Sequence, residues 1–278
     1  MSLLVPIGLT AGLAIVFELL ILRFILSLLR NTGVVRQNYR GVYIPVAVGI
    51  TFPMTVLLTQ TVLQLAGRTM GEQFTVFLLG IAFISLLGLL DDLLGSRDAL
   101  GFRGHFSRLL RGELTTGGLK ALGGGFVALY MAVQFSPSWR DLLVNVLLLA
   151  LFTNLINLLD LRPGRAVKGF LLIFLVIPTV ARVQFQIYVP LVAATLAYFP
   201  FDLKAKVMMG DAGSNVLGLT LGTMCVLGMD LPFRLGTLAF LILVHLFTEK
   251  YSLTEIIDRF AVLRYLDNLG RGDKTSGK

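Results

Sequence analysis

The sequence is poor in the residue types on which several common kinds of site depend. It holds one cysteine, two histidines and one tryptophan in 278 residues. The single cysteine, Cys225, excludes an intramolecular disulfide. Without a cluster of Cys and His at ligand spacing, a zinc site is excluded too. There is also no Walker-type phosphate loop and no serine nucleophile elbow.

Charge is scarce as well. Charged residues make up 14% and hydrophobic residues 56% of the chain, whereas soluble domains average about 25% and about 45–50%. Both deviations indicate a polytopic membrane protein. We therefore expect an all-α bundle of transmembrane helices, forming a single integral membrane domain over residues 1–278.

Long apolar runs predict about nine spans, with boundaries accurate to within a few residues. The runs cover about 3–29, 43–65, 74–94, 117–135, 139–158, 167–184, 186–201, 213–229 and 233–257. The first run contains Glu18 and Arg23 but no small-residue cleavage site, so we predict a retained span and no cleaved signal peptide.

The basic residues predict the orientation. The net charge is +8, and 19 of the 24 Lys and Arg residues fall on one side of the nine spans. The positive-inside rule places that side in the cytosol, with the N-terminus outside and the C-terminus inside. The charge is thus a topology signal and does not indicate nucleic-acid binding. The predicted cytosolic loops, which we expect to be catalytic, are about 30–42, 91–116, 159–168, 202–213 and 250–278.

Polar residues gather at the cytosolic ends of two spans. Asp91 and Asp92 end the third span, and the stretch NLINLLD ends the fifth. Its Asn154, Asn157 and Asp160 are spaced i, i+3, i+6, which predicts a polar stripe on one helix face. We expect that stripe to point into the bundle or its mouth. Taken alone, the Asp91-Asp92 pair could be a solvated helix end. The polar stripe, taken alone, could be a hydrogen-bonded contact between helices.

A glycine-rich turn precedes the eighth span. The stretch KVMMGDAGS, residues 206–214, places Asp211 between Gly210 and Gly213, which allow a close approach of the backbone. Ser214 is predicted to cap the span, whose N-terminal amides can receive an anion. The turn could also be no more than a helix cap.

Basic side chains accompany these acids. The segment RGHFSRLLRGELTTGGLK, residues 103–120, ends at Lys120, and Arg165 and Lys168 follow the polar stripe. From charge and position alone we predict that Lys120, Arg165 and Lys168 contact phosphates.

Together these features indicate phosphoryl transfer. Ionisable groups near membrane depth are costly and are functional candidates by default. Hard carboxylate oxygens suit Mg²⁺, which bridges one or two carboxylates to substrate phosphates. Carboxylates, Mg²⁺ and cations are the components of phosphoryl-transfer sites.

The order of Asp91-Asp92, NLINLLD and KVMMGDAGS resembles the polyprenyl-phosphate N-acetylhexosamine-1-phosphate transferase superfamily, over about residues 30–260. The resemblance implies transfer of a sugar-1-phosphate from a UDP-sugar to undecaprenyl phosphate, with Mg²⁺ and release of UMP. The lipid phosphate attacks the β-phosphate of the donor. The products start cell-envelope glycans, which implies a plasma-membrane protein with its active site facing the cytosol.

The resemblance also implies roles for residues. Asp211 matches the metal-binding Asp of the family, and Asp91 and Asp92 match its essential acidic pair. One acid of this pair could act as a base, or both could serve metal binding and positioning; we expect Asp92 as the second metal ligand. Asn157 and Asp160 match the stripe that lines the nucleotide site, which begins here at Asn154. Ser214 would belong to the substrate-binding turn.

The chain departs from the family pattern where the donor is recognised. The family continues its stripe as DGxDGLA, but here the residues are DLRPGRA, with Leu161 and Pro163 in place of Gly and Asp. The last loop, HLFTEKYSLTEIIDR, has one His and no His-rich motif, and YRGVYIPVAVG replaces GTPTMGG. Nine spans stand where ten are usual. We therefore predict a divergent branch with altered donor use.

Three other readings stay open from sequence. A degenerate, non-catalytic relative could act as a scaffold or lipid-binding partner. A transporter would use its acids for ion coupling, but it needs polar residues near mid-membrane. A CDP-alcohol phosphotransferase would show a DG…AR…G…D…D pattern that the sequence lacks. The sequence does not fix the oligomeric state, and a homodimer is one arrangement that it allows.

Overall fold

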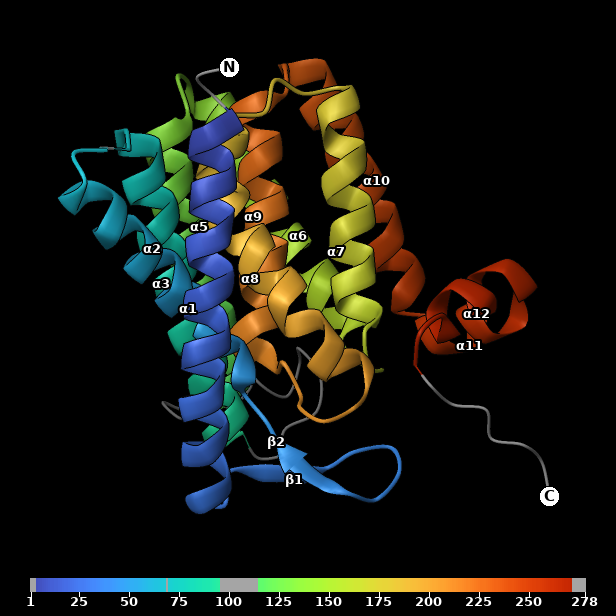
Figure 1. Ribbon diagram of the computed structural model, residues 1–278. Helices are drawn as coiled ribbons and strands as arrows, with labels where there is room; N and C mark the ends of the chain where they lie inside the picture. The colour runs from blue at the N-terminus through green and yellow to red at the C-terminus, as the bar shows by residue number, and fades with distance from the viewer. Residues whose placement is uncertain (1–3, 69, 96–114, 272–278) are drawn as a thin grey trace.

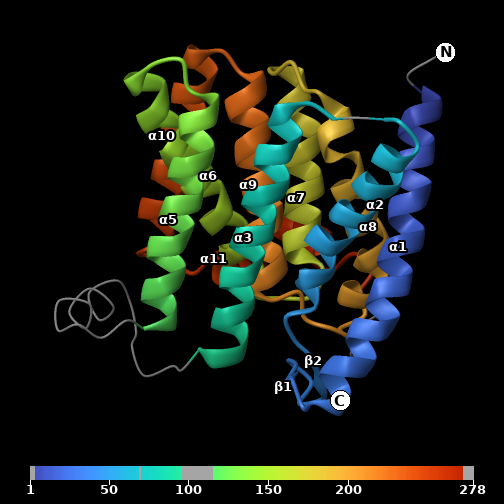
Figure 2. The same ribbon diagram turned by 90° about the vertical axis from the view of Figure 1, so that its left-hand side faces the viewer.

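The protein is described by a computed structural model, covering residues 4–68, 70–95 and 115–271. Over these residues it forms eleven α-helices, two short 3₁₀ turns and one two-stranded antiparallel ribbon. The helices pack side by side as a bundle (Figures 1 and 2). The predicted class, an all-α polytopic membrane bundle, is confirmed.

Nine of the described helices correspond to the predicted spans. They are α1 (Leu4–Asn31), α2 (Thr51–Leu65), α3 (Glu72–Leu94), α5 (Thr116–Phe135), α6 (Trp139–Leu159), α7 (Arg165–Val176), α8 (Phe185–Leu203), α9 (Asp211–Gly228) and α10 (Leu231–Thr248). Seven of them are long and apolar enough to cross a membrane, and α7 and α9 are the exceptions. Helix α7 is short and continues as the 3₁₀ turn η2 (Ile177–Thr179).

Helix α9 lies at the centre of the bundle. Every residue from Ala212 to Val226 is buried, and the helix packs against α3 and α6. A Cβ at Gly218 would meet the backbone of Phe152 and Thr153, and one at Gly222 would meet Leu149. These two glycines are therefore packing positions, which let α9 and α6 approach closely.

Two predicted boundaries were wrong. The second span does not begin at residue 43, because Tyr43–Pro45 is strand β2, paired antiparallel with β1 (Val35–Gln37). The 3₁₀ turn η1 (Val48–Ile50) follows, entered through Ala47 at a φ of 62°. Helix α2 begins only at Thr51.

The ninth span does not continue to residue 257. Helix α10 ends at Thr248, and α11 (Leu253–Arg259) and α12 (Ala261–Asn268) follow. Ser252 starts α11 by accepting a hydrogen bond from the Glu255 amide at 3.5 Å. The apolar residues of this segment therefore belong to a separate helix pair beside the lower end of the bundle (Figure 1).

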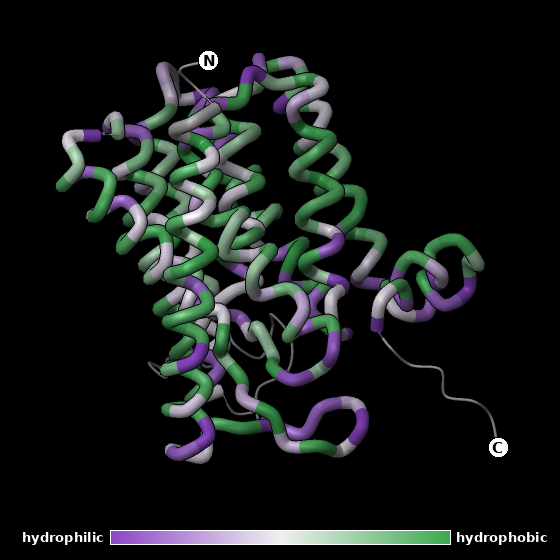
Figure 3. Tube along the Cα trace, viewed as in Figure 1, coloured by the Kyte–Doolittle hydropathy of each residue, from purple (hydrophilic) through white to green (hydrophobic). Residues whose placement is uncertain are grey.

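The two ends of the bundle differ. The N-terminus lies at one end, and the β1–β2 ribbon, the last turn of α3 and the first turn of α9 lie at the other (Figures 1 and 2). Hydrophilic residues concentrate at that second end and on α11 and α12 (Figure 3). The predicted site residues fall there.

Candidate functional site: an acidic cluster at one end of the bundle

The site is built on the last turn of α3. Asp91 and Asp92 are adjacent, and successive helical residues point about 100° apart. The side chain of Asp92 is therefore turned into the bundle and is buried, while that of Asp91 is half-buried and faces α5. The two acids do different things.

The Asp92 carboxylate caps α9. Its Oδ1 accepts a hydrogen bond from the Asp211 amide and its Oδ2 one from the Ala212 amide, each at 3.1 Å. Gly210, the preceding residue, has a φ of 71°, and a Cβ there would collide with the Asp92 carboxylate. Glycine is required at this position on both grounds.

The predicted capping role of Ser214 was wrong. The residue at the N-cap is Gly210, and no side chain of α9 itself caps the helix. The Ser214 hydroxyl is buried and has no hydrogen-bond partner among the described residues. The anion predicted at this helix terminus is thus the carboxylate of Asp92, which the local sequence around α9 could not show.

Lys120 lies between two of the acids. Its Nζ is 3.2 Å from Asp91 Oδ2 and forms a second, short ion pair with Asp211 Oδ2. Lys120 had been predicted as a phosphate contact from charge alone, and the structure brings it to the two carboxylates. We call Asp91, Asp92, Asp211 and Lys120 the acidic cluster, because Lys120 pairs with Asp91 and Asp211, and Asp92 accepts a hydrogen bond from the Asp211 amide.

A cavity of about 240 Å³ opens beside the acidic cluster. Its charged lining residues are Arg36, Asp92, Asp160, Arg162, Asp202 and Asp211. Sequence reasoning did not choose Arg36, Arg162 or Asp202 as site residues. Arg36 Nη2 donates to the Asp92 carbonyl at 2.5 Å, and the buried Asp202 accepts from the Gly164 amide at 2.9 Å. Neither belongs to a motif, since strand β1 and the last turn of α8 (Phe185–Leu203) reach the cavity only in the folded chain.

The cavity carries excess negative charge. Burial, together with the charges of Asp202, Asp211 and Asp92, raises the pKa of Asp160 well above its usual range. A cation or a hydrogen-bond acceptor in the cavity would relieve this crowding. Perturbed carboxyls beside a cavity are typical of functional sites.

The polar stripe of α6 divides in the structure. Asp160 lines the cavity, and Asn157 Nδ2 donates to Asn215 Oδ1 at 3.3 Å, joining α6 to α9. Asn154 is exposed on the helix surface, so it does not point into the bundle as expected. The i, i+6 positions are about 120° apart on a helix, which is too wide for one narrow stripe.

Arg165 is not brought to the cavity. Its buried guanidinium donates to both oxygens of Asp267 on α12, at 2.8 and 2.9 Å, and to Thr254 Oγ1 at 2.9 Å. Lys168 Nζ donates to the carbonyls of Leu266 and Asp267 at 2.9 and 2.7 Å. Both cations therefore hold α12 against the start of α7.

A second guanidinium completes this contact. Arg271 also binds both oxygens of Asp267 and donates from Nε to the Pro163 carbonyl at 2.7 Å. Burial opposes ionisation of Asp267, but its hydrogen bonds with Arg165 and Arg271 and their charges outweigh this and lower its pKa to about 2. We call Asp267, Arg165, Arg271 and Lys168 the C-terminal ion cluster.

The donor set can be compared with the needs of Mg²⁺. In the described part of the chain, no group of three or more His, Cys, Asp or Glu side chains is arranged to hold a metal alone. Mg²⁺, however, uses one or two carboxylates and completes its shell with water and substrate phosphates. Asp91 and Asp211 already converge on one cation, the Lys120 ammonium, so this pair fits such a metal.

Residues 103–114 of the predicted 103–120 segment, His105 among them, lie outside the described residues.

Fold and site together define a class: a membrane helix bundle that holds acids and bases around a cavity at one of its ends. A family model described as glycosyl transferase family 4 matches residues 74–229, more than half of the chain. The chain belongs to glycosyl transferase family 4. No curated protein matches it.

The match confirms the resemblance found in the sequence and supports a sugar-phosphate transferase activity in general terms. The matched region runs from α3 to the end of α9. It includes the whole acidic cluster and Asp160, and it leaves out the β1–β2 ribbon and the helices α11 and α12.

Proposed function

We propose that the protein transfers a sugar-1-phosphate from a UDP-sugar to a polyprenyl phosphate, undecaprenyl phosphate in the simplest case. The reaction requires Mg²⁺, releases UMP and takes place on the cytosolic face of the plasma membrane. One observation carries the proposal: in a family 4 chain, carboxylates from α3 and α9 gather around Lys120 beside a polar cavity at the basic end of the bundle.

The carboxylates would have separate roles. Mg²⁺, when bound, neutralises charge on the phosphates that react. Asp91 and Asp211 would hold it, since they already share a cation. Asp92 fixes Asp211 through the start of α9, and its oxygens keep acceptor capacity for a metal contact of their own.

The cavity would take the donor. Arg36 and Arg162 are the guanidinium groups in its wall, and they suit a diphosphate. Asp160, whose pKa is raised, can keep a proton and donate a hydrogen bond to a base or sugar carbonyl. Leu161 and Pro163, which depart from the family pattern, line the same cavity and support an altered choice of donor.

The acceptor would arrive from the membrane. An oxygen of the lipid phosphate attacks the β-phosphorus of the donor, and the bond from that phosphorus to the oxygen bridging it to UMP breaks. UMP leaves with that oxygen. Lys120 is placed to exchange its carboxylate partners for the incoming phosphate, because its ammonium is the cation of the acidic cluster.

The test is transfer from a panel of labelled UDP-sugars to undecaprenyl phosphate by purified protein with Mg²⁺. We expect transfer by the wild type, none by Asp211→Asn, and wild-type turnover by Asp258→Asn. Asp258 is a matched control because its carboxylate is exposed and pairs only with Arg162 among the described residues.

Full turnover by Asp211→Asn would contradict the assignment. Absence of transfer with every UDP-sugar, from folded wild-type protein, would instead favour a non-UDP donor or the non-catalytic, lipid-binding alternative.

A further inference from the structure

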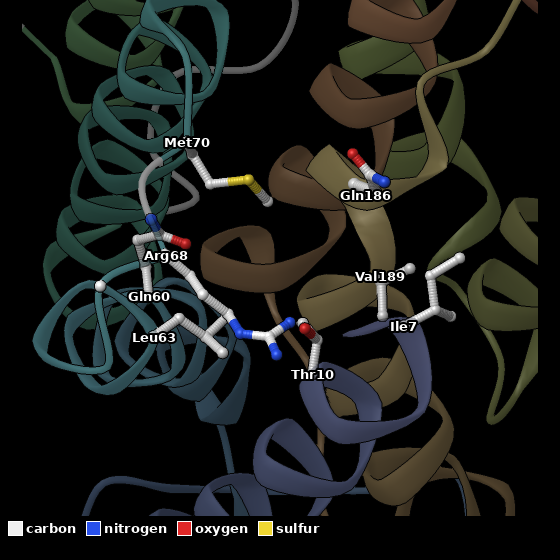
Figure 4. Close-up of a pocket in the computed structure, with 9 residues that line it drawn as sticks. Ile7, Thr10, Gln60, Leu63, Arg68, Met70, Gln186 and Val189 are labelled. Atoms are coloured by element: carbon white, nitrogen blue, oxygen red, sulfur yellow. The ribbon is translucent and has the colours of Figure 1, made fainter. Parts of the chain in front are cut away.

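A second pocket lies at the opposite end of the bundle from the acidic cluster. It has a volume of about 390 Å³ and is formed by the start of α1, the end of α2 and the start of α8. Its lining residues are Ile7, Thr10, Gln60, Leu63, Gly67, Arg68, Met70, Gln186 and Val189 (Figure 4). A volume of this size falls within the usual range for small-molecule sites, about 300–1,000 Å³.

Gln60 is the unusual member of this pocket. Its side chain is 3% exposed, and neither its Nε2 nor its Oε1 has a hydrogen-bond partner among the described residues. A buried primary amide without partners is costly, and such groups require an explanation. A ligand with a donor or acceptor in the pocket would supply one.

Arg68 gives the pocket its charge. The Arg68 guanidinium makes no ion pair with the described residues and extends across the pocket toward Thr10, between Gln60 on one side and Val189 on the other (Figure 4). Gln186 adds a second, exposed carboxamide at the start of α8. A guanidinium with nearby amides is a good match for a phosphate group, which accepts several hydrogen bonds at once.

The remaining walls are apolar. Ile7, Leu63, Met70 and Val189 line the pocket, and Leu9 and Leu65, close in sequence, are exposed apolar side chains on the outside of α1 and α2. The molecule that fits therefore combines a phosphate with a hydrocarbon part lying along the helices.

We propose that this pocket binds the phosphodiester headgroup of an anionic phospholipid, at the membrane face opposite the acidic cluster. Arg68 binds the phosphate, and Gln60 and Gln186 bind its oxygens and the adjoining glycerol. The acyl chains lie against the apolar surface of α1 and α2. The site is separate from the proposed transferase centre and stands independently of it.

Binding of short-chain phosphatidylglycerol to detergent-purified protein, measured by native mass spectrometry, tests the proposal. We expect one bound lipid on the wild type and affinity weaker by about tenfold for Arg68→Gln, since a charge-assisted pair is lost. Gln60→Leu should also weaken binding, yet leave the melting temperature of the lipid-free protein equal or higher, because it removes an unpaired buried amide.

Arg140→Gln is the matched control. Arg140 begins α6 at the same end of the bundle, and its guanidinium lies over the Trp139 ring at 5.7 Å, outside the pocket. Wild-type binding by this variant, with weakened binding by the other two, would support the site. Equal binding by all four proteins would overturn it.

Inorganic phosphate and glycerol phosphate are the comparison ligands. If either binds as tightly as phosphatidylglycerol, with the same dependence on Arg68, the pocket takes a soluble phosphate and the lipid assignment is wrong. Weak binding of both, beside tight binding of the lipid, supports it.

Discussion

The acidic cluster and the C-terminal ion cluster lie at the same end of the bundle but have opposite charge balance. In the first, Asp91 and Asp211 share the ammonium of Lys120, and the carboxylate of Asp92 lies beside Asp211 at the edge of a cavity. In the second, one carboxylate, Asp267, is held by two guanidinium groups and is 6% exposed. Every charged side chain of the second cluster has a hydrogen-bond partner, so this cluster joins elements. In the first cluster the carboxylates outnumber their one cation beside a cavity, which suits a cationic ligand.

The largest expected effect lies in the acidic cluster. Asp91→Asn removes one of the two carboxylates that share a cation, and we expect it to lower kcat by about a hundredfold or more. Its melting temperature should stay close to that of the wild type, because Asp91 is only half-buried. Transfer assays and thermal melts on one preparation measure both. Undiminished kcat would remove Asp91 from the reaction.

The Asp267→Asn variant should lose stability and keep its turnover. It leaves Arg165 and Arg271 buried without a full counter-charge, which we expect to destabilise the protein by about 3–5 kcal/mol. Turnover per folded molecule should change little. Denaturant unfolding measures the loss of stability, and transfer assays measure the turnover. A folded variant without turnover would show that the C-terminal ion cluster takes part in chemistry.

The contribution of Asp267 to the stability of the protein depends on pH. The pKa of Asp267 is about 2 when folded and about 3.9 when unfolded. Its contribution is therefore complete above the unfolded value and is lost as the pH falls through the folded one. The stability gap between wild type and Asp267→Asn should stay constant from about pH 5 to about pH 8. A gap that shrinks within that range would mean that Asp267 is not held ionised by its partners.

The sequence predicted the acidic cluster better than the C-terminal ion cluster, for a physical reason. Three acids lie at the ends of apolar runs: Asp91, Asp92 and Asp211. A carboxylate is easily recognised there, and the charge pattern predicts the side of the membrane on which it lies. Arg165 and Lys168 stand at such an end too, and charge alone placed them in the site. Their partner, Asp267, is about a hundred residues away in the last predicted loop, 250–278, where no motif marks it.

Other parts of the fold were hidden for similar reasons. The predicted second span includes strand β2, because the apolar run that begins at Tyr43 looks like the start of a helix. The sequence does not show that the first residues of this run pair with β1. Arg36 and Asp202 reach the cavity only through long-range contacts. The nine helices of the bundle could be predicted, because apolar length is a local property, although only seven of them are long and apolar enough to cross a membrane.

A smaller effect is expected from alanine substitution of Gly210, which tests backbone strain and the geometry of the site together. Gly210→Ala places a Cβ at positive φ and against the Asp92 carboxylate. The left-handed backbone alone costs about 1–2 kcal/mol. Gly33→Ala is the control, since it has the same kind of φ, 74°, with nothing within 4 Å of its Cβ. We expect Gly210→Ala to lose more stability than Gly33→Ala, because its Cβ also meets the Asp92 carboxylate, and we expect loss of turnover only for Gly210→Ala. Equal turnover would mean that the Asp92 cap is dispensable.

The smallest effect is expected at the cavity rim. Arg162→Ala breaks an exposed ion pair with Asp258, at 3.1 Å, and surface pairs contribute about 0–1 kcal/mol. Stability should hardly change, while the KM for the donor rises and kcat is kept, because Arg162 lines the cavity. Steady-state kinetics over donor concentration measure this. An unchanged KM would remove Arg162 from donor binding.

The most direct measurement is Mn²⁺ binding, read by electron paramagnetic resonance as a substitute for Mg²⁺, with UMP present. The account predicts that the wild type and Asp267→Asn bind Mn²⁺ and that Asp211→Asn does not. Binding by Asp211→Asn with wild-type affinity would contradict the claim that the acidic cluster, with its unpaired charge, is the chemical centre of the protein.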